Sequence, residues 1–573
     1  MGIARFFLWL KNQFGQDIQE LTRDQTFSDI SLEIDNFMID LNGVFHGSAQ
    51  KIYEYGNNKP KTRLLSHPKK QSSTGGGLKK QIKVFEDVCA TIERLFKLVK
   101  PKQRLILCVD GPAPQSKQNQ QRQRRYRKTT DGEKCEFDSC SITPGTKFMD
   151  YLTKYIDWYI RKRISEDDDW QNIQVIFSNE KAEGEGEYKC MQYIRNYGDE
   201  NETYCLHGMD ADLVMLSLGT HVENFYILRD ELYKQAVEFL VVNIGKIRHD
   251  LDSLLKWEGD SYNPECAIND FIFMCFVVGN DFLPHIPSIE IMEGGIDTMI
   301  DVYRQVCKEY GHLTSKTKSG IFFNKDILGI FLGTVSQHEK KMFETKLSRK
   351  DNFFPDNLLE KHAVFKGQDG YDLNLDEYKK EYYSTHFPKD EPLEKICHDY
   401  MEGMQWVMNY YTKGVPNWNW YFPYHYAPFA SDIAKYSKEY QQPVYRESSA
   451  VTPYQQLLSV LPPSSSQLLP PPLCNLLTEK SSPLKKFYPD VFDIDVAGKK
   501  NEWEGVVILP MVKFDDVRSA YFSVLGSVDK QELKRNIAGK SFVYVYNNEE
   551  IFTFRSYYGD IEKCRATIES LDL

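Results

Sequence analysis

The stretch CLHGMDADLVMLSL, residues 205–218, carries the pattern that decides the fold. An apolar approach leads to Asp210 and Asp212, and an apolar run follows them directly. This order is typical of a buried strand that ends and passes into a helix. Two carboxylates in apolar surroundings are costly unless a positive charge lies between them, and carboxylate oxygens are preferred ligands of Mg²⁺ and Mn²⁺. The pattern therefore indicates either a divalent metal site or an acidic cap at the start of a helix.

The composition indicates a folded protein of more than one domain. The chain has 573 residues, of which 41% are hydrophobic and 13% aromatic, and this length predicts two or three domains. No run approaches the roughly 20 apolar residues that a membrane helix needs. Residues 1–14 predict an amphipathic helix rather than a signal peptide, because charged residues interrupt their apolar patch.

The cysteines and the charge narrow the class of protein further. The 12 cysteines are scattered, with no CxxC pair and no Cys/His cluster at zinc spacing. We therefore expect a reducing compartment and a cytoplasmic location, with the nucleus left open. The net charge of −11 argues against a nucleic-acid coat protein, but it allows a local basic site on an acidic body.

Other apolar runs also lead into acidic residues. The runs are 37–39 before Asp40, 104–109 before Asp110, 174–178 before the loop EGEGE at 183–187, and 271–278 before Asp281. The glycines of the loop allow backbone conformations in which its carboxylates converge. Strands with intervening helices predict a parallel α/β sheet.

In a parallel sheet, the side chains that follow the strands gather at the carboxyl ends of those strands. Seven carboxylates would then lie in one crevice: Asp40, Asp110, Glu185, Glu187, Asp210, Asp212 and Asp281. So many negative charges cannot share a site without cations. Two divalent ions about 4 Å apart would offset the repulsion and form a centre for phosphodiester hydrolysis.

A cationic segment follows Asp110 closely. Residues 117–128, KQNQQRQRRYRK, contain six positive residues and no acidic one, and they are good helix formers. On a helix, one face would present Lys117, Gln121, Arg124 and Arg125 together. A charged run of this kind usually forms a basic helix whose side chains face the solvent. A binding face is the alternative, because this is the one dense cationic helix expected in an acidic chain.

The rest of the chain divides into regions that differ in amino-acid composition. We expect a core over 1–335 with a flexible basic insertion at about 56–80, a linker or helical segment over 336–395, and a second region over 396–573. Residues 406–429 hold ten aromatics, which predicts a packed corner in which one or two rings could stack on bases. Residues 448–472 are rich in Ser, Pro and Leu and predict an extended segment over the domain below.

The ordered motifs resemble the XRN-type 5′→3′ exoribonuclease family. They are MGIARFFLWL (1–10), DLNGVFH (40–46), VDGPAPQSKQNQQRQRRYR (109–127), FDSCSITPGTKFMDYL (137–152), EGEGEYKCMQYIR (183–195), GMDADLVMLSL (208–218), FVVGNDFLPHIPSIEIMEGGID (276–297) and WNWYFPYHYAP (418–428). Weaker similarity continues to about residue 545. The chain resembles a compact member of this family, without the C-terminal modules of the large cytoplasmic enzymes.

The resemblance implies an α/β catalytic core related to PIN-like and flap-nuclease folds, with a mainly helical, aromatic-rich C-terminal region. It implies that the seven carboxylates bind two Mg²⁺ or Mn²⁺ ions. By the same resemblance, a pocket for the 5′-monophosphate of RNA is formed by Lys117, Gln121, Arg124 and Arg125. Base stacking is assigned to His46 and to one of Trp418 and Trp420, of which Trp420 is favoured.

The function implied is processive 5′→3′ hydrolysis of 5′-monophosphorylated single-stranded RNA to nucleoside 5′-monophosphates, in RNA decay. We expect a monomer that does not use a membrane. Two alternatives remain. A flap-type 5′ DNA nuclease would share the carboxylate crevice, and an inactive RNA-binding scaffold is disfavoured because the full ligand set of a two-metal centre is present.

Overall fold

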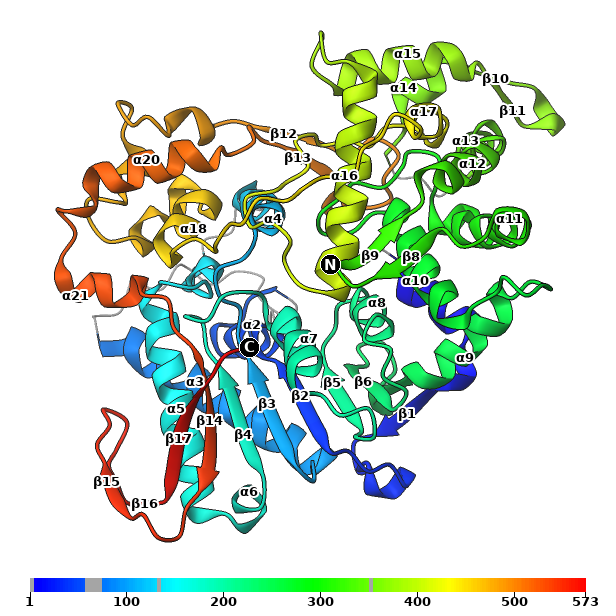
Figure 1. Ribbon diagram of the computed structural model, residues 1–573. Coiled ribbons are helices and arrows are strands. Elements are labelled where there is room, and N and C mark those ends of the chain that lie inside the picture. The colour runs from blue at the N-terminus through cyan, green and yellow to red at the C-terminus, as the bar shows by residue number, and fades with distance from the viewer. Residues whose placement is uncertain (1–4, 57–74, 131–134, 350–353) are drawn as a thin grey trace.

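The computed structural model describes residues 5–56, 75–130, 135–349 and 354–573 (Figure 1). Most of the expected basic insertion at about 56–80 lies outside these ranges. The predicted N-terminal helix is α1 (Phe6–Gln13), and it buries Phe6, Trp9 and Leu10. Among the described residues, no helix is long and apolar enough to cross a membrane.

A nine-stranded sheet forms the centre of the fold. In spatial order its strands are β1 (Ile18–Thr22), β7 (Val237–Asn243), β6 (Phe225–Asp230), β5 (Tyr204–His207), β2 (Asn36–Asp40), β3 (Arg104–Cys108), β4 (Gln174–Ser178), β14 (Ser541–Tyr546) and β17 (Ala566–Leu571). The five strands from β6 to β4 are parallel, which confirms the predicted α/β core. Their apolar runs are nearly continuous because both faces of the parallel strands are covered.

Both edges of the sheet are antiparallel and extend the predicted parallel core. The short segment 231–236 joins β6 to β7, and a parallel pair needs a crossover of about a dozen residues or more. On the other side, β14 and β17 extend the sheet from the far end of the chain (Figure 1). The C-terminal region therefore completes the sheet of the core, while the domain boundaries at 335 and 395 remain predictions.

Alternate residues of the central strands point into two separate cores. Met38, Ile106 and Leu206 belong to one hydrophobic cluster, and Phe37 and Leu105 belong to another. The first cluster includes residues of α7 (Gly186–Tyr197), α8 (Leu213–Leu218), α9 (Ile244–Leu255) and α10 (Pro264–Cys275). The second includes residues of α2 (Leu41–Tyr53), α3 (Gly75–Val99), α5 (Lys147–Glu166) and α6 (Asp168–Gln171). Helices thus cover both faces of the sheet.

The remaining elements form the aromatic-rich, mainly helical part. The helices are α4 (Gln115–Thr130), α11 (Gly295–Tyr310), α12 (Lys325–Ser336), α13 (Glu339–Ser348), α14 (Asn357–Lys361), α15 (Leu375–His386), α16 (Leu393–Thr412), α17 (Ala430–Tyr436), α18 (Pro453–Val460), α19 (Asn475–Thr478), α20 (Phe514–Leu525) and α21 (Lys530–Leu533). The small hairpins pair β8 (Thr314–Thr317) with β9 (Gly320–Phe323), β10 (Ala363–Phe365) with β11 (Tyr371–Leu373), β12 (Asp493–Asp495) with β13 (Val506–Ile508), and β15 (Phe552–Phe554) with β16 (Ile561–Cys564).

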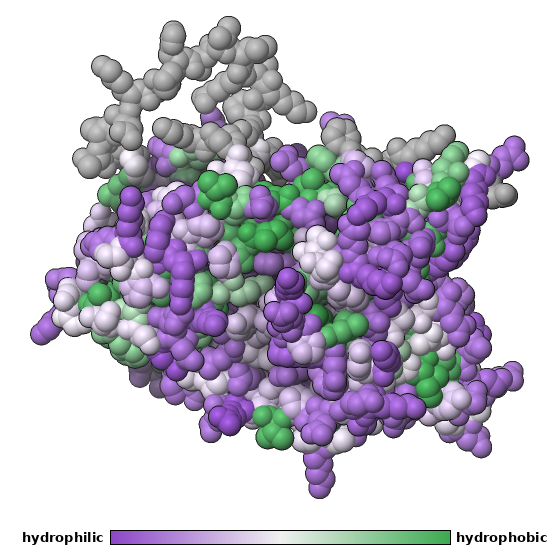
Figure 2. Space-filling model, turned by 90° about the horizontal axis from the view of Figure 1, so that it is seen from above, coloured by the Kyte–Doolittle hydropathy of each residue, from purple (hydrophilic) through white to green (hydrophobic). Residues whose placement is uncertain are grey.

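Figure 1 shows α4 between α18 and α20 on one side and α16 on the other. Seen from above, the surface is mostly hydrophilic, with hydrophobic residues gathered near the middle of that face (Figure 2).

Two stretches differ from their predicted structure. The apolar run 271–278, which the pattern groups with the strands, is the end of α10 followed by a 3₁₀ turn. Asn263 caps α10, Pro264 occupies its first turn, and the run is apolar all round because the helix is buried. Residues 448–472 are not one extended segment, because residues 453–460 form α18 and are all buried. Thr452 and Gln455 form a capping box at its start, and Pro453 suits the first helical turn.

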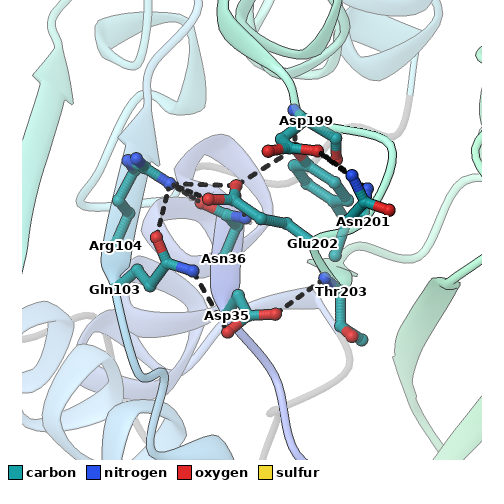
Figure 3. Close-up of polar contacts among 9 residues, drawn as sticks. Asp35, Asn36, Gln103, Arg104, Asp199, Asn201, Glu202 and Thr203 are labelled. Carbon is teal, nitrogen blue, oxygen red and sulfur yellow. Dashed lines mark hydrogen bonds and ion pairs between the residues drawn. The ribbon is translucent and has the colours of Figure 1, made fainter.

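A polar network ties the amino ends of the central strands together (Figure 3). Arg104 at the start of β3 donates to Glu202 and to Asn36, each at 3.0 Å. The carboxylate of Asp35 accepts from the N–H of Thr203 at 2.9 Å and from the amide of Gln103 at 3.3 Å. These bonds join the loop before β5 to the starts of β2 and β3. They fix the strand register whose other end carries the acidic residues.

Candidate active site

The parallel strands bring three acidic residues to one edge of the sheet. Asp40 is the last residue of β2, Asp110 follows β3, and Asp210 follows β5. In the register of the sheet, Asp40 lies beside Cys108 of β3, and Ile39 lies beside His207 of β5.

Asn42 holds two of these carboxylates. Asp40 caps α2 by accepting from the N–H of Asn42 at 3.3 Å. The amide of Asn42 donates to Asp110 at 2.7 Å and accepts from the N–H of Asp110 at 3.0 Å. The N–H of Gly186 donates to the other oxygen of Asp110 at 2.8 Å. A Cβ at Gly186 would lie 2.4 Å from Asp40 Oδ1, so the close approach of Asp40 requires glycine there.

Lys117 enters the acidic cluster from α4. Its Nζ lies 2.7 Å from Asp281 Oδ2 and 3.9 Å from Glu187 Oε1, and it also pairs with Glu185. The lysine is 7% exposed. Burial disfavours its charge, but the charges of Asp281, Glu185 and Glu187 raise the pKa of Lys117 well above its ordinary value. The cluster therefore contains a permanent positive charge supplied by the chain.

Hydroxyl and amide donors also hold two of these acids. Tyr410 on α16 donates to Glu185 at 2.8 Å, and Gln120 on α4 donates to Asp281 at 3.0 Å. Lys117 lowers the pKa of Asp281 below its ordinary range, although burial alone would raise it. Two elements far apart in sequence thus complete an arrangement that begins at the sheet edge.

Glu187, Asp210 and Asp212 form the part of the cluster that fits a metal ion. One carboxylate oxygen from each lies within 4.8 Å of the others. Asp212 is 2% exposed, and its Oδ1 has no hydrogen-bond partner in the described part of the chain. Burial, and then the charges of Asp281 and Asp210, raise the pKa of Asp212 to about 7. Three converging carboxylates with an unsatisfied buried oxygen are the donor set that a hard divalent cation requires.

Repulsion between neighbouring carboxylates raises the pKa of several members of the acidic cluster. Burial raises the pKa of Asp40 well above its ordinary value, and Asp110, Asp210 and Glu185 raise it further. Burial, followed by the charge of Asp212, also raises the pKa of Glu187 well above its ordinary value. The structure therefore brings all seven predicted carboxylates together, and their individual roles stay predictions.

The predicted phosphate-binding face of α4 is divided between two environments. Lys117 points into the acids, whereas Arg124 lies exposed two turns further along. Arg125 is half-buried, its Nη1 has no hydrogen-bond partner among the described residues, and burial lowers its pKa. Gln121 accepts from the amide of Gln456 on α18 at 3.4 Å. The two arginines and Gln121 are thus available beside the cluster.

His46 and Trp420 lie in positions that differ from that of Trp418. His46 is half-buried on α2, and burial followed by the charges of Lys128, Arg124 and Arg125 lowers its pKa to about 3. Trp420 is half-buried and stacks on Trp406, with 5.0 Å between ring centroids. Trp418 is 8% exposed, and its carbonyl accepts from the N–H of Gln115 at 2.9 Å. Of the two tryptophans, Trp420 is the less buried residue.

Several residues of the site were missed by sequence reasoning. Asn42 carries a signal, because it lies two residues after the predicted carboxylate Asp40. Tyr410 and Gln120 carry none, since an aromatic cluster and a polar helix do not indicate which side chain reaches an acid. Tyr410 is 225 residues away from Glu185 along the chain.

The fold and the site define an α/β protein with a buried carboxylate centre suited to divalent cations. A family model described as "XRN 5'-3' exonuclease N-terminus" matches residues 1–231. A second, described as "Xrn1 helical domain", matches residues 261–374 and 359–571. The chain belongs to the XRN 5′-3′ exonuclease family and is thereby a nuclease.

The curated relatives have a sequence identity to this chain of between a quarter and a third. The "5'-3' exoribonuclease 2 homolog" of Drosophila melanogaster is 29% identical over 96% of this chain and 74% of its own length. The "5'-3' exoribonuclease 2" of Arabidopsis thaliana is 30% identical over 95% of this chain and 69% of its own length. The "5'-3' exoribonuclease 1" of Saccharomyces cerevisiae is 28% identical over 98% of this chain and 46% of its own length. The chain therefore spans less than half of the yeast relative.

Solved structures are more distant. The catalytic core of Rad2 in complex with DNA substrate is similar to this chain with 14% identity and a TM-score of 0.31, over 60% of this chain and 76% of that one.

Proposed function

We propose that this chain is a 5′→3′ exoribonuclease that hydrolyses 5′-monophosphorylated single-stranded RNA to nucleoside 5′-monophosphates, processively and in RNA decay. The observation that carries the proposal is the position of α4, which places Lys117 inside the acidic cluster and Arg124 and Arg125 beside it. One helix thus joins a candidate hydrolytic centre to a candidate phosphate pocket. Membership of the family and the printed names of the relatives support RNA as the substrate.

We propose that the seven carboxylates hold two Mg²⁺ or Mn²⁺ ions. The unsatisfied Asp212 oxygen and the mutual approach of Glu187, Asp210 and Asp212 support a cation at that position. Bound divalent cations activate an attacking water and stabilise the leaving oxygen of a phosphodiester. Around them, Asn42 orients Asp110, Tyr410 orients Glu185, and Lys117 holds Glu185 and Asp281 in place.

Recognition of the RNA end is assigned to the cationic face of α4. Arginine forks bind phosphate oxygens through two parallel hydrogen bonds, and the unpartnered Nη1 of Arg125 is a donor that such a bond would satisfy. Gln121 and Arg124 flank it on the same helix face. A closed pocket of this kind would refuse capped or triphosphorylated ends by size.

The bases of the strand would stack on His46 and Trp420. His46 remains neutral at physiological pH because its pKa is lowered to about 3, so its ring stacks without carrying a charge. Stacking on an aromatic side chain is worth about 1–3 kcal/mol per base and does not depend on sequence. It would hold the strand while the new 5′ end moves to α4.

The assembly and location of the protein are also proposals. The 12 cysteines are free, which supports a reducing compartment, and we propose a cytoplasmic monomer with the nucleus as the alternative.

The experiment compares one RNA that bears a 5′-monophosphate, a 5′-hydroxyl or a 5′-triphosphate with single-stranded DNA, each incubated with purified protein and Mg²⁺. The proposal predicts that only the monophosphate RNA is degraded, and that mononucleotides are released. Equal attack on all RNA ends would mean that α4 does not read the end. A preference for DNA would favour a flap-type nuclease, and metal binding without cleavage would favour the scaffold.

A further inference from the structure

A cavity of about 600 Å³ lies beside α4 and reaches the acidic cluster. Asp281, one of the seven carboxylates, forms part of its inner wall together with Ser116 and Gln120. At the other end its lining includes Met292 and Trp503, which are 40% and 60% exposed. The cavity therefore runs from the candidate reaction centre to the surface.

The cavity and the proposed phosphate pocket use different faces of α4. Ser116, Gln120 and Gln123 line the cavity, whereas Gln121 and Arg124 belong to the face proposed to hold the RNA end. Residues three and four apart share a helix face, so these two sets point in different directions. The helix thus separates an entrance for RNA from a second opening, and the two meet at Asp281.

A second cavity of about 410 Å³ lies next to the first. The two share lining residues, which are Pro284, His285, His425, Lys499 and Val506. The two cavities are therefore neighbours, with Lys499 at their junction.

Lys499 supplies a basic side chain at the junction. Within the described ranges, no carboxylate lies at ion-pair distance from Lys499. Burial followed by the charge of Lys346 lowers its pKa, and the more distant charges of Glu290, Glu504 and Asp495 oppose that lowering. By contrast, the wall acid Glu504 already accepts from the N–H of Lys500 at 3.1 Å and pairs with Arg5 at 3.4 Å. Burial and then Lys499 lower the pKa of His285 to about 3. An anion at the junction would meet Lys499, on which the described acids Glu290, Glu504 and Asp495 act only from beyond ion-pair distance.

Aromatic side chains line the outer part of the first cavity. Trp503 is an exposed residue, and its backbone carbonyl accepts a hydrogen bond from Arg127 of α4. The cavity is also lined by Tyr421, Phe422 and Tyr424. A positive charge for a phosphate and an exposed aromatic ring for a base are the two features that bind a nucleotide.

We propose that this cavity binds the released nucleoside 5′-monophosphate and is the route by which it leaves the site. The inference rests on the proposed exoribonuclease function, because only that reaction makes a mononucleotide at Asp281. A strand that stays engaged occupies the entrance, so each product needs another way out. The phosphate would bind at Lys499 and the base at Trp503, in a space within the range of small-ligand pockets.

The test measures equilibrium binding of adenosine 5′-monophosphate to the full chain by calorimetry, with adenosine as the comparison ligand. A nuclease-resistant phosphorothioate RNA with a 5′-monophosphate is first added to saturation, so that it fills the α4 pocket. Lys499→Met removes the charge at constant length, and Trp503→Ala removes the exposed ring. The matched controls are Lys318→Met and Phe522→Ala, which are exposed and line neither cavity.

We expect the monophosphate to bind more tightly than adenosine, and each cavity variant to weaken its binding by about tenfold, while the controls leave it unchanged. The concentration of monophosphate that inhibits RNA decay should rise in parallel. If Lys499→Met fails to fold, the exposed Trp503→Ala decides the matter. Unchanged monophosphate binding in the folded cavity variants would overturn the inference while leaving the nuclease intact. If the chain releases no mononucleotide, titration without RNA still tests the site, and the proposed function alone fails.

Discussion

Lys117 Nζ lies 2.7 Å from Asp281 Oδ2, so the first residue of the cationic run on α4 belongs to the acidic cluster. A buried lysine among carboxylates offsets part of their repulsion in the absence of metal. It also fixes the distance between α4 and the strand ends. The end-reading face and the hydrolytic centre are therefore parts of one rigid arrangement.

Replacing Lys117 by methionine should destabilise the metal-free protein by about 3–5 kcal/mol, because the variant leaves buried carboxylates without a partner. Urea unfolding measures the loss, and Mg²⁺ should restore part of it. Lys154→Met is the control, since its pair with Asp150 at 2.6 Å is exposed on the lysine side and should contribute less than about 1 kcal/mol. Equal losses in the two variants would show that Lys117 is not embedded as described.

Stability of the metal-free protein should fall as the pH rises from about 4 to about 7 through the contribution of Asp212. Its folded pKa of about 7 exceeds the unfolded value, so the folded state binds the extra proton and loses that advantage as the pH rises. Urea unfolding in chelator across this range should give a smaller loss in Asp212→Asn. Parallel curves for the variant and the parent protein would contradict the burial and repulsion assigned to this carboxylate.

Gly186→Ala should lower the rate of RNA cleavage by at least about tenfold, because its Cβ would lie 2.4 Å from Asp40 Oδ1 and displace that carboxylate. The comparison is Gly526→Ala, where no atom lies within 4 Å of the added Cβ. Steady-state cleavage of 5′-monophosphorylated RNA measures both. Equal cleavage rates in Gly186→Ala and Gly526→Ala would contradict this part of the account.

Tyr410→Phe should reduce cleavage severalfold with little effect on RNA binding, since it removes the hydroxyl that donates to Glu185 at 2.8 Å. The neighbouring Tyr411 offers a matched control, because its buried hydroxyl has no hydrogen-bond partner in the described chain. Tyr411→Phe should keep the parent rate. Cleavage and filter-binding assays on the same RNA separate the two effects, and similar losses in both variants would assign the effect to packing.

The sequence predicted much of the fold because the central strands are short apolar runs that end in acids. The same feature predicted which carboxylates would approach one another, since parallel strands share one carboxyl edge. The helix α4 was predicted from its composition, but the direction of Lys117 was not. Helical spacing groups Lys117 with Arg124, while tertiary contacts bind it to Asp281.

What the sequence could not predict depends on contacts between distant segments. The apolar run 271–278 has no periodicity that separates a buried helix from a buried strand. The antiparallel edge made by β14 brings the chain terminus to β4, which no local pattern indicates. For α18 a local signal existed, because Thr452 and Gln455 have capping-box spacing, but the Ser and Pro content around them suggested an extended chain.

The most direct test of the central claim is the ratio of single-turnover cleavage rates for 5′-monophosphate and 5′-hydroxyl RNA, measured in the parent protein, Arg125→Ala and Asp212→Ala. The account predicts a ratio of about a hundred or more in the parent and a fall of about tenfold or more in Arg125→Ala, because charged hydrogen bonds to the phosphate are lost. It predicts no cleavage of either RNA by Asp212→Ala, with RNA binding retained. A ratio near one in the parent protein, or cleavage by Asp212→Ala at the parent rate, would contradict the claim that α4 and the carboxylate cluster act together as an end-reading nuclease.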